Sequence, residues 1–195
     1  MTKDFSLIFL FLAGKCKIMT SGQRATYLRY LNESSETILQ ALDAIPDEQF
    51  TIRPKEDLWS AADVMEHLLK VESFIIDNLS HVGPDPINSA MVVTLSDEEV
   101  LKQAADAQQK TKAREESRPS GMFKTKAEAV KAFNERRNKS KAFIETTDAN
   151  LTSFTFPHPR MGLMSGTNWL VFVSGHSLKH VPQLEAIAKE LLGRD

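Results

Sequence analysis

Residues 169–192 read WLVFVSGHSLKHVPQLEAIAKELL, and their apolar positions recur with the period of an α-helix. His176 and His180 are four residues apart, a spacing that places two helical side chains on one face with Cβ atoms ~5–6 Å from each other. The apolar stripe of that face continues on both sides of the pair, so both imidazoles are expected to point into the protein interior. A shared metal ion would hold two neighbouring buried imidazoles, and the rest of the chain must support or refuse this hypothesis.

Pro182 lies inside this predicted helix, just after His180. A proline there removes the backbone hydrogen bond to Leu178 and clashes with that carbonyl, so the sequence predicts a kink. Because the kink falls within one turn of His180, it either alters the geometry of the histidine pair or serves function by freeing a carbonyl. The sequence leaves both interpretations open.

Composition limits the classes of protein that fit the chain. Its 195 residues suit one domain, and its 42% hydrophobic and 26% charged residues are typical of a soluble globular protein. The net charge of −2 gives no basic excess, so nucleic acid is not an expected partner. The single cysteine, Cys16, excludes an internal disulfide and cysteine-rich zinc sites and favours a cytoplasmic location. Any metal must therefore be held by His, Asp or Glu.

Residues 1–19 are expected to form an extension ahead of one domain at residues 20–195. The apolar run at 5–13, FSLIFLFLA, is too short to span a bilayer but has the length of a signal-peptide core. Met19 stands directly before the first helical pattern, so an upstream start codon is favoured over an export signal or a packed extra element. No membrane partner is expected.

Apolar periodicity and capping signals predict an all-α fold, a bundle of four main helices with one lesser extra helix. Ser60 with Asp63, and Thr125 with Glu128, have the spacing of capping boxes. No alternating strand pattern of any length occurs. Besides the segment at 169–192, helices are expected at 24–45, from 60 to the Gly83–Pro84 stop, after Ser96 as the lesser and peripheral helix, and from 125 through 144.

The segment between the last two main helices, residues 151–166, is an apolar loop that contains Phe154, Phe156, Met161 and Met164. In one interpretation the two phenylalanines pack under the end of the bundle. In the other the loop forms a wall or lid over a pocket, to which the methionines offer adaptable apolar contact.

The chain has five histidines, and three of them are expected to face inward. His67 lies on the apolar stripe of the second helix, so it can join His176 and His180 in a triangle of imidazoles from two helices. A single buried histidine is more often a core residue than a ligand, but three histidines with open positions are typical of a catalytic metal site. His81, near a helix C-terminus, is interpreted as structural.

Other polar residues are candidates for orienting the imidazoles or contacting a substrate. Glu66, Glu72 and Gln183 are close to the histidines along their helices, although for each the interpretation as a polar residue at a bundle edge is favoured. Arg137 follows Phe133 by one turn and is a candidate for binding an anionic substrate. Its interpretation as a solvated arginine beside Arg136 is favoured.

Three motifs carry a family resemblance: WS-x5-EHL-x3-E at 59–72, HP-x2-G at 158–162, which contains His158, and GH-x3-H-x2-Q at 175–183. In this order they resemble the DinB/YfiT-like superfamily over residues 24–192. The resemblance implies a four-helix bundle with up-down-down-up connections, a homodimer, and a zinc or nickel ion held by His67, His176 and His180. Some members are thiol-dependent transferases, which adds a low-molecular-weight thiol to the candidate cofactors.

Two classes of function stay open. The first is a divalent-metal-dependent enzyme, a transferase or hydrolase that acts on a small molecule through a metal-activated thiol or water. The absence of a nucleophile motif agrees with this class, and no glycine-rich segment indicates a nucleotide cofactor. The second is a non-catalytic helical bundle that binds a ligand or dimerises, with a vestigial tri-histidine site.

Overall fold

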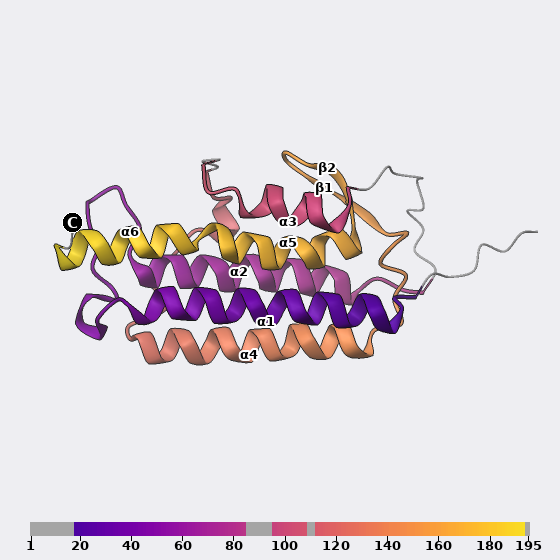
Figure 1. Ribbon diagram of the computed structural model, residues 1–195, viewed down its shortest axis with the longest axis horizontal. Coiled ribbons are helices and arrows are strands. Elements are labelled where there is room, and N and C mark those ends of the chain that lie inside the picture. Colours follow the sequence, from indigo (N-terminus) through magenta and orange to yellow (C-terminus); the bar gives the residue numbers. More distant parts are fainter. Residues whose placement is uncertain (1–17, 85–94, 109–111, 194–195) are drawn as a thin grey trace, which may run out of the picture.

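The computed structural model describes residues 18–84, 95–108 and 112–193 (Figure 1). The predicted all-α bundle is confirmed, with a small β-hairpin added to it. In chain order the elements are α1 Ser21–Asp43, the 3-10 turn η1 Asp47–Gln49, α2 Ala61–Ser80, α3 Asp97–Ala105, the 3-10 turn η2 Glu115–Ser117, α4 Lys126–Thr146, β1 Thr155–His158, β2 Gly162–Ser165, α5 Gly166–Lys179 and α6 Val181–Leu192.

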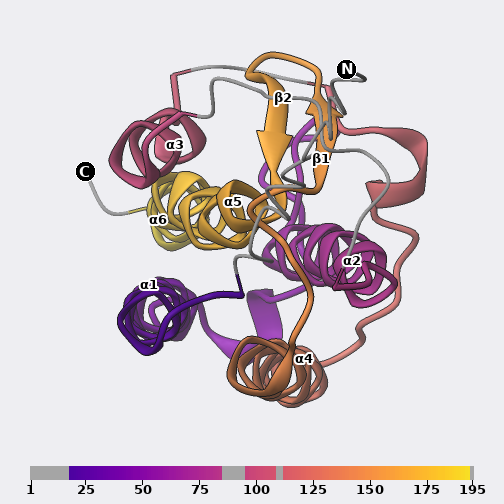
Figure 2. The ribbon, with the colours of Figure 1, turned by 90° about the vertical axis from the view of Figure 1, so that its right-hand side faces the viewer.

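Four rods of helix make the bundle: α1, α2, α4, and α5 continued by α6. The colours of Figure 1 show that α2 and α4 run in the same direction, opposite to α1 and to α5–α6, which is the expected up-down-down-up order. Figure 2 shows α3 outside this bundle, where it packs on α5. No helix among the described residues combines the length and the apolar character that a membrane span requires.

Local hydrogen bonds at the helix starts explain why the helices begin where they do. The Ser60 side chain accepts from the Asp63 backbone N–H, and the Asp63 carboxylate accepts from the Ser60 backbone N–H, so the predicted capping box is confirmed. Thr125 and Glu128 make the same reciprocal pair at the start of α4. Each box satisfies backbone donors that the first helical turn leaves without partners.

The apolar core has two parts, one at each end of the bundle. The first includes Leu31 of α1, Ile75 of α2, Trp169 of α5 and the hairpin residue Met164. The second includes residues from the other halves of α1 and α2, from the first half of α4, and from the buried face of α6. Buried polar side chains lie among them: Ser34, Glu66, His67, Glu72, Arg137, Ser140, Ser177 and His180. The bundle therefore contains a polar layer that apolar packing alone does not require.

The segment at 151–166, expected to be a loop without strand structure, contains a two-stranded antiparallel sheet. Thr155 pairs with Ser165 and His158 with Gly162, and Gly162 has a positive φ of 71° at the turn. Phe156 stacks on Trp169 with ring centroids 4.2 Å apart, so the hairpin packs onto α5. The prediction of a strand-free chain was wrong because four-residue strands are too short to show alternation.

Three smaller expectations meet different outcomes. The apolar period of the second helix predicts that Phe74 is buried, but its side chain is 51% exposed, so this prediction is wrong. The expected α3 is present, and it is held to the bundle by buried Val100 and Ala104. The expected extension at 1–19 lies almost entirely outside the described residues, although Met19 itself is buried in the core.

Pro182 has the predicted effect and divides the last rod in two. The helix α5 ends at Lys179 and α6 begins at Val181, with His180 as the residue between them. Proline is favoured in the first turn of a helix, where its missing N–H is no loss. The break therefore places His180 at the junction of two helices rather than in the middle of one.

Candidate metal centre

His67 of α2, His176 of α5 and His180 at the α5–α6 junction converge on one point. Their Nε2 atoms are 3.3 Å apart for His67 and His176 and 3.4 Å apart for His176 and His180, and the three ligand nitrogens all lie within 4.8 Å of one another. His67 is 5% and His180 8% exposed, whereas His176 is half-buried. The structure thus brings together all three histidines that the sequence pointed to.

Hydrogen bonds on the far side of two rings hold them in orientation. The Nδ1–H of His67 donates to the Ser117 backbone carbonyl at 2.8 Å, and the Nδ1–H of His180 donates to Oε1 of Gln183 at 2.7 Å. A carbonyl oxygen can only accept, so Nδ1 carries the proton and the Nε2 lone pair points toward the other histidines. Gln183, a predicted orienting residue, therefore does contact a site histidine.

Aromatic side chains enclose the histidines. The Trp59 ring lies 5.0 Å from the His67 ring and stacks on His180 at 6.5 Å, and Phe172 stacks on His176 at 5.4 Å. These rings restrict rotation of the imidazoles and keep water from two sides of the cluster. Of the three residues, His176 has the largest exposed fraction.

Burial lowers the pKa of all three imidazoles. Desolvation is the main cause for each, and it lowers the pKa of His180 to about 4 and that of His176 well below its usual value. In His67 desolvation also lowers the pKa, although the hydrogen bond to Ser117 acts against it. Neutral imidazole is the form that binds a metal ion, so the site is in its ligating form at neutral pH.

The donor set fits a tetrahedral metal ion such as zinc. Four ligands with Zn–N bonds of ~2.0–2.1 Å lie ~3.3 Å from one another. The two Nε2 separations that involve His176 are close to this value, and the third pair of ligand nitrogens lies within 4.8 Å. Three neutral histidines leave one tetrahedral position for a water or a substrate, which is the donor set of catalytic rather than structural zinc sites. His67, His176 and His180 would hold the ion.

Glu66 directly precedes His67 on α2, but its carboxylate makes its hydrogen bonds and its ion pair away from the three histidines. Its buried carboxylate accepts from the backbone N–H groups of Ser120, Gly121 and Met122 and pairs with Lys70 at 2.7 Å. Although burial raises its pKa, the ion pair with Lys70 and these hydrogen bonds lower it overall, to about 2. Glu66 therefore anchors the segment at 117–122, which begins at the last residue of η2 and supplies the Ser117 carbonyl to His67.

Arg137 is 2% exposed, so its favoured interpretation as a solvated arginine was wrong. Its Nε lies 3.0 Å from Oε2 of Glu72, and its guanidinium also donates to Ser34 and Ser177. Glu72 accepts a further hydrogen bond from Ser140 at 2.6 Å. The Arg137–Glu72 ion pair lies beside the metal centre, because Arg137 donates to Ser177, the residue after His176. These hydrogen bonds and this ion pair of Arg137 and Glu72 involve none of the three site histidines.

His158 lies at the end of β1, and the Phe172 ring contacts both its ring and that of His176. The His158 ring is 4.9 Å from that of Phe172, which in turn stacks on His176. Its Nδ1 accepts from the backbone N–H groups of Arg160 and Met161, so Nε2 carries the proton. Desolvation, with smaller effects of nearby cations, lowers its pKa to about 4. His158 is thus a neutral hydrogen-bond donor near the site and not a fourth ligand of the cluster.

Two residues that contribute to the site, Phe172 and Ser117, were not predicted from the sequence. Phe172 precedes His176 by four residues, so helical spacing alone could have predicted their stacking. The Ser117 carbonyl is a backbone group in a connection fifty residues from His67, and no side-chain pattern signals it.

Comparisons with known proteins agree with this fold. The model of the DinB superfamily matches residues 30–184. The chain is 23% identical over 161 residues to the uncharacterized protein YuaE of Bacillus subtilis (strain 168), an alignment that covers 82% of this chain and 96% of YuaE. Its fold is similar to that of YfiT from Bacillus subtilis, with a TM-score of 0.53, 15% identity and 91% of each chain covered. YfiT is described as a probable metal-dependent hydrolase with an unusual four-helix bundle topology.

Proposed function

The chain belongs to the DinB superfamily, and from this premise we propose that it is a hydrolase of small molecules that depends on a divalent metal ion, zinc or nickel. The observation that carries the proposal is the convergence of three neutral imidazoles, with Nε2 separations of 3.3 and 3.4 Å, in a partly open cluster. The description of YfiT as a probable metal-dependent hydrolase supports the choice of hydrolysis.

The ion, when bound, would supply Lewis acidity and lower the pKa of a water or a thiol beside the substrate. The protein's own residues provide the rest. Ser117 and Gln183 fix the two buried imidazoles with their Nε2 lone pairs directed inward. Trp59 and Phe172 exclude water from two sides, and the Nε2–H of His158 is a donor for a substrate oxygen that approaches past Phe172.

Metal analysis and activity assays test the proposal together. Protein purified without a histidine tag is expected to contain close to one zinc or nickel ion per chain and to hydrolyse some members of a panel of activated esters and amides. His176→Ala should lose both properties. His81→Gln is the matched control, because His81 is an exposed histidine at the C-terminus of α2, and it should retain both.

Two results would contradict the proposal. Protein without metal at pH 8 would favour the non-catalytic ligand-binding or dimerising bundle, because the imidazoles are neutral at that pH. Metal-loaded protein that turns over only thiol-plus-electrophile mixtures would instead indicate a transferase. The homodimer that the family resemblance implies stays a prediction, which sedimentation equilibrium can test against the 21.9 kDa mass of one chain.

A further inference from the structure

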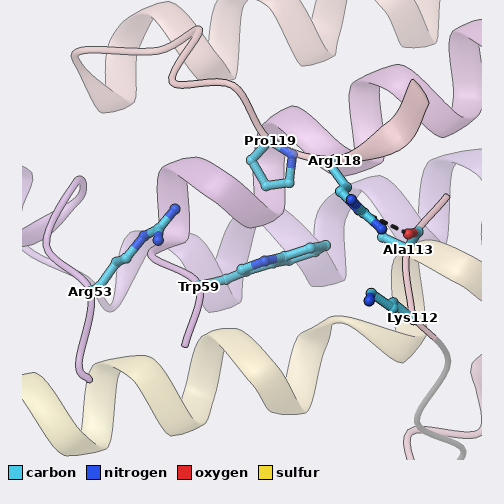
Figure 3. Close-up of a pocket in the computed structure, with 6 residues that line it drawn as sticks. All are labelled: Arg53, Trp59, Lys112, Ala113, Arg118 and Pro119. Atoms are coloured by element: carbon cyan, nitrogen blue, oxygen red, sulfur yellow. Dashed lines mark hydrogen bonds between the residues drawn. The ribbon is translucent and has the colours of Figure 1, made fainter. Parts of the chain in front are cut away.

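A cavity of about 250 Å³ lies beside the candidate metal centre (Figure 3). In Figure 3 the Trp59 ring extends between Arg53 at one end and Arg118 with Lys112 at the other. Ala113 and Pro119 complete the lining. This volume is near the lower limit of ordinary small-molecule pockets, so the cavity suits a compact ligand.

Trp59 joins this cavity to the histidine cluster. Its ring lines the cavity and also lies 5.0 Å from the His67 ring and 6.5 Å from the His180 ring. Arg118, at the opposite end from Arg53, directly follows Ser117, whose carbonyl orients His67. A ligand in the cavity would therefore contact the residues that form one wall of the metal centre.

The charged side chains that line the cavity are all cations. Arg53 is paired with Asp63 at 2.9 Å. Within residues 18–84, 95–108 and 112–193, neither Lys112 nor Arg118 lies within ion-pair distance of a carboxylate. The whole chain has a net charge of −2, so this local positive charge does not reflect a basic protein. Unpaired cations around a small cavity favour an anionic ligand.

More distant cations add to the positive potential. Lys179 acts on the pKa of all three site histidines, and Arg114 and Arg160 act with it on that of His158. Asp106 offsets part of the charge of Lys179. Cations outside the cavity lining therefore also act on the site histidines.

The position of Arg118 is fixed by the segment that carries it. Lys70 donates to the Arg118 carbonyl at 2.7 Å, and the Glu66 carboxylate accepts from three backbone N–H groups at 120–122. The Arg118 Nε donates to the Ala113 carbonyl at 3.3 Å, which leaves its terminal nitrogens for a ligand. The backbone of Arg118 is thus held in place, and one hydrogen bond restricts its exposed guanidinium, which reduces the entropy lost on binding an anion.

We propose that this cavity binds the anionic group, a carboxylate or a phosphate, of the small molecule on which the metal centre acts, with Lys112 and Arg118 as its main contacts. This inference rests on the proposed function, because it assigns the substrate class of the same site. Arg137 was the candidate for anion binding in the sequence, but Glu72 neutralises its charge. The inference therefore assigns anion binding to the cavity residues instead.

Binding to metal-free protein tests the anion site independently of the metal. The Trp169→Phe variant leaves Trp59 as the sole tryptophan, so its fluorescence reports on the cavity. Succinate and inorganic phosphate are titrated separately at constant ionic strength, with succinamide as the uncharged counterpart of succinate. Calorimetry on the wild-type protein repeats the measurement without any change to the core.

Saturable binding of succinate, of phosphate or of both, but not of succinamide, is the expected result. Lys112→Gln and Arg118→Gln should each weaken binding by roughly threefold to tenfold, and the double variant should abolish it. Lys139→Gln, an exposed lysine on α4, is the matched control and should bind as the wild type does. Absence of saturable binding by either method, equal binding of succinamide, or affinity unchanged in the double variant would overturn the proposal.

The two proposals fail separately. If the protein binds succinate but never takes up zinc or nickel, the proposed anion site stands and the proposed metal-dependent hydrolase is refuted. If the protein takes up one metal ion per chain but binds neither anion, the proposed metal centre stands and the proposal of an anionic substrate is refuted.

Discussion

Gln183 shows how one side chain can affect the metal affinity of the candidate site. Its Oε1 accepts the Nδ1–H of His180 at 2.7 Å, which fixes the ring and its tautomer. Loss of such an orienting partner typically costs roughly tenfold to a hundredfold in metal affinity. Gln183→Ala is therefore expected to weaken zinc binding by about this factor, as measured by competition with a chromogenic chelator.

Gln40→Ala supplies the comparison for this variant, because Gln40 is exposed on α1. Its zinc affinity should equal that of the wild type. If Gln183→Ala also binds zinc with wild-type affinity, the hydrogen bond to His180 does not contribute to metal binding.

Gly175 determines the contact between the elements α3 and α5. A Cβ atom at this position would lie 2.6 Å from Cβ of Ala104 and 3.0 Å from the Leu101 carbonyl, so the two helices would have to move apart. Overpacking of this kind typically costs about 1–3 kcal/mol. Gly175→Ala should lower the free energy of unfolding in urea denaturation by this overpacking cost, less the ~1 kcal/mol that alanine gains over glycine in a helix.

Gly83→Ala is the control for this contact, because a Cβ atom there meets nothing within 4 Å. Adding Ala104→Gly to Gly175→Ala should relieve the contact and restore part of the stability, despite a cost of about 1 kcal/mol for glycine in a helix. A double variant no more stable than Gly175→Ala would exclude the Ala104 contact as the cause.

Glu66 couples the element α2 to the segment at 117–122, and the coupling depends on pH. Burial raises its pKa, but the Lys70 ion pair and backbone hydrogen bonds lower it overall from 4.5 to about 2. Because the folded-state pKa is lower than the unfolded one, protonation favours the unfolded state. The stability that Glu66 contributes is fully present above pH 4.5 and is lost as the pH falls toward 2.

Glu66→Gln should therefore reduce stability at neutral pH and weaken its dependence on pH between 4.5 and 2, as measured by urea denaturation at a series of pH values. Glu145→Gln changes an exposed glutamate of α4 and should leave the profile unchanged. A Glu66→Gln profile parallel to that of the wild type would show that the carboxylate is not the titrating group.

Metal binding should stabilise the molecule as a whole, because the three histidines come from α2 and from the α5–α6 rod. A ligand at a hundred times its Kd adds ~2.7 kcal/mol to a folded state that alone binds it, which for a chain of this size raises the Tm by about 5–10 °C. Scanning calorimetry with and without zinc measures this shift. His67→Ala should abolish it, and His81→Gln should preserve it; an equal shift in His67→Ala would place the bound zinc elsewhere.

Local interactions explain what the sequence by itself determined. Helical period and capping boxes operate within one or two turns, so the starts of α2 and α4 could be predicted from Ser60, Asp63, Thr125 and Glu128. The pairing of His176 and His180 follows from a spacing of four residues. The break at Pro182 follows from a missing N–H and a clash within one turn.

Only the tertiary structure decided how the distant parts meet. His67 is 109 residues from His176, and the Nε2 separation of 3.3 Å between them depends on how α2 packs against α5. The burial of Arg137 depends on Glu72, Ser34 and Ser177 of three other helices, so its own helix could not reveal it. Such contacts result from packing and from the desolvation of charge, which act between elements and leave no periodic signal along the chain.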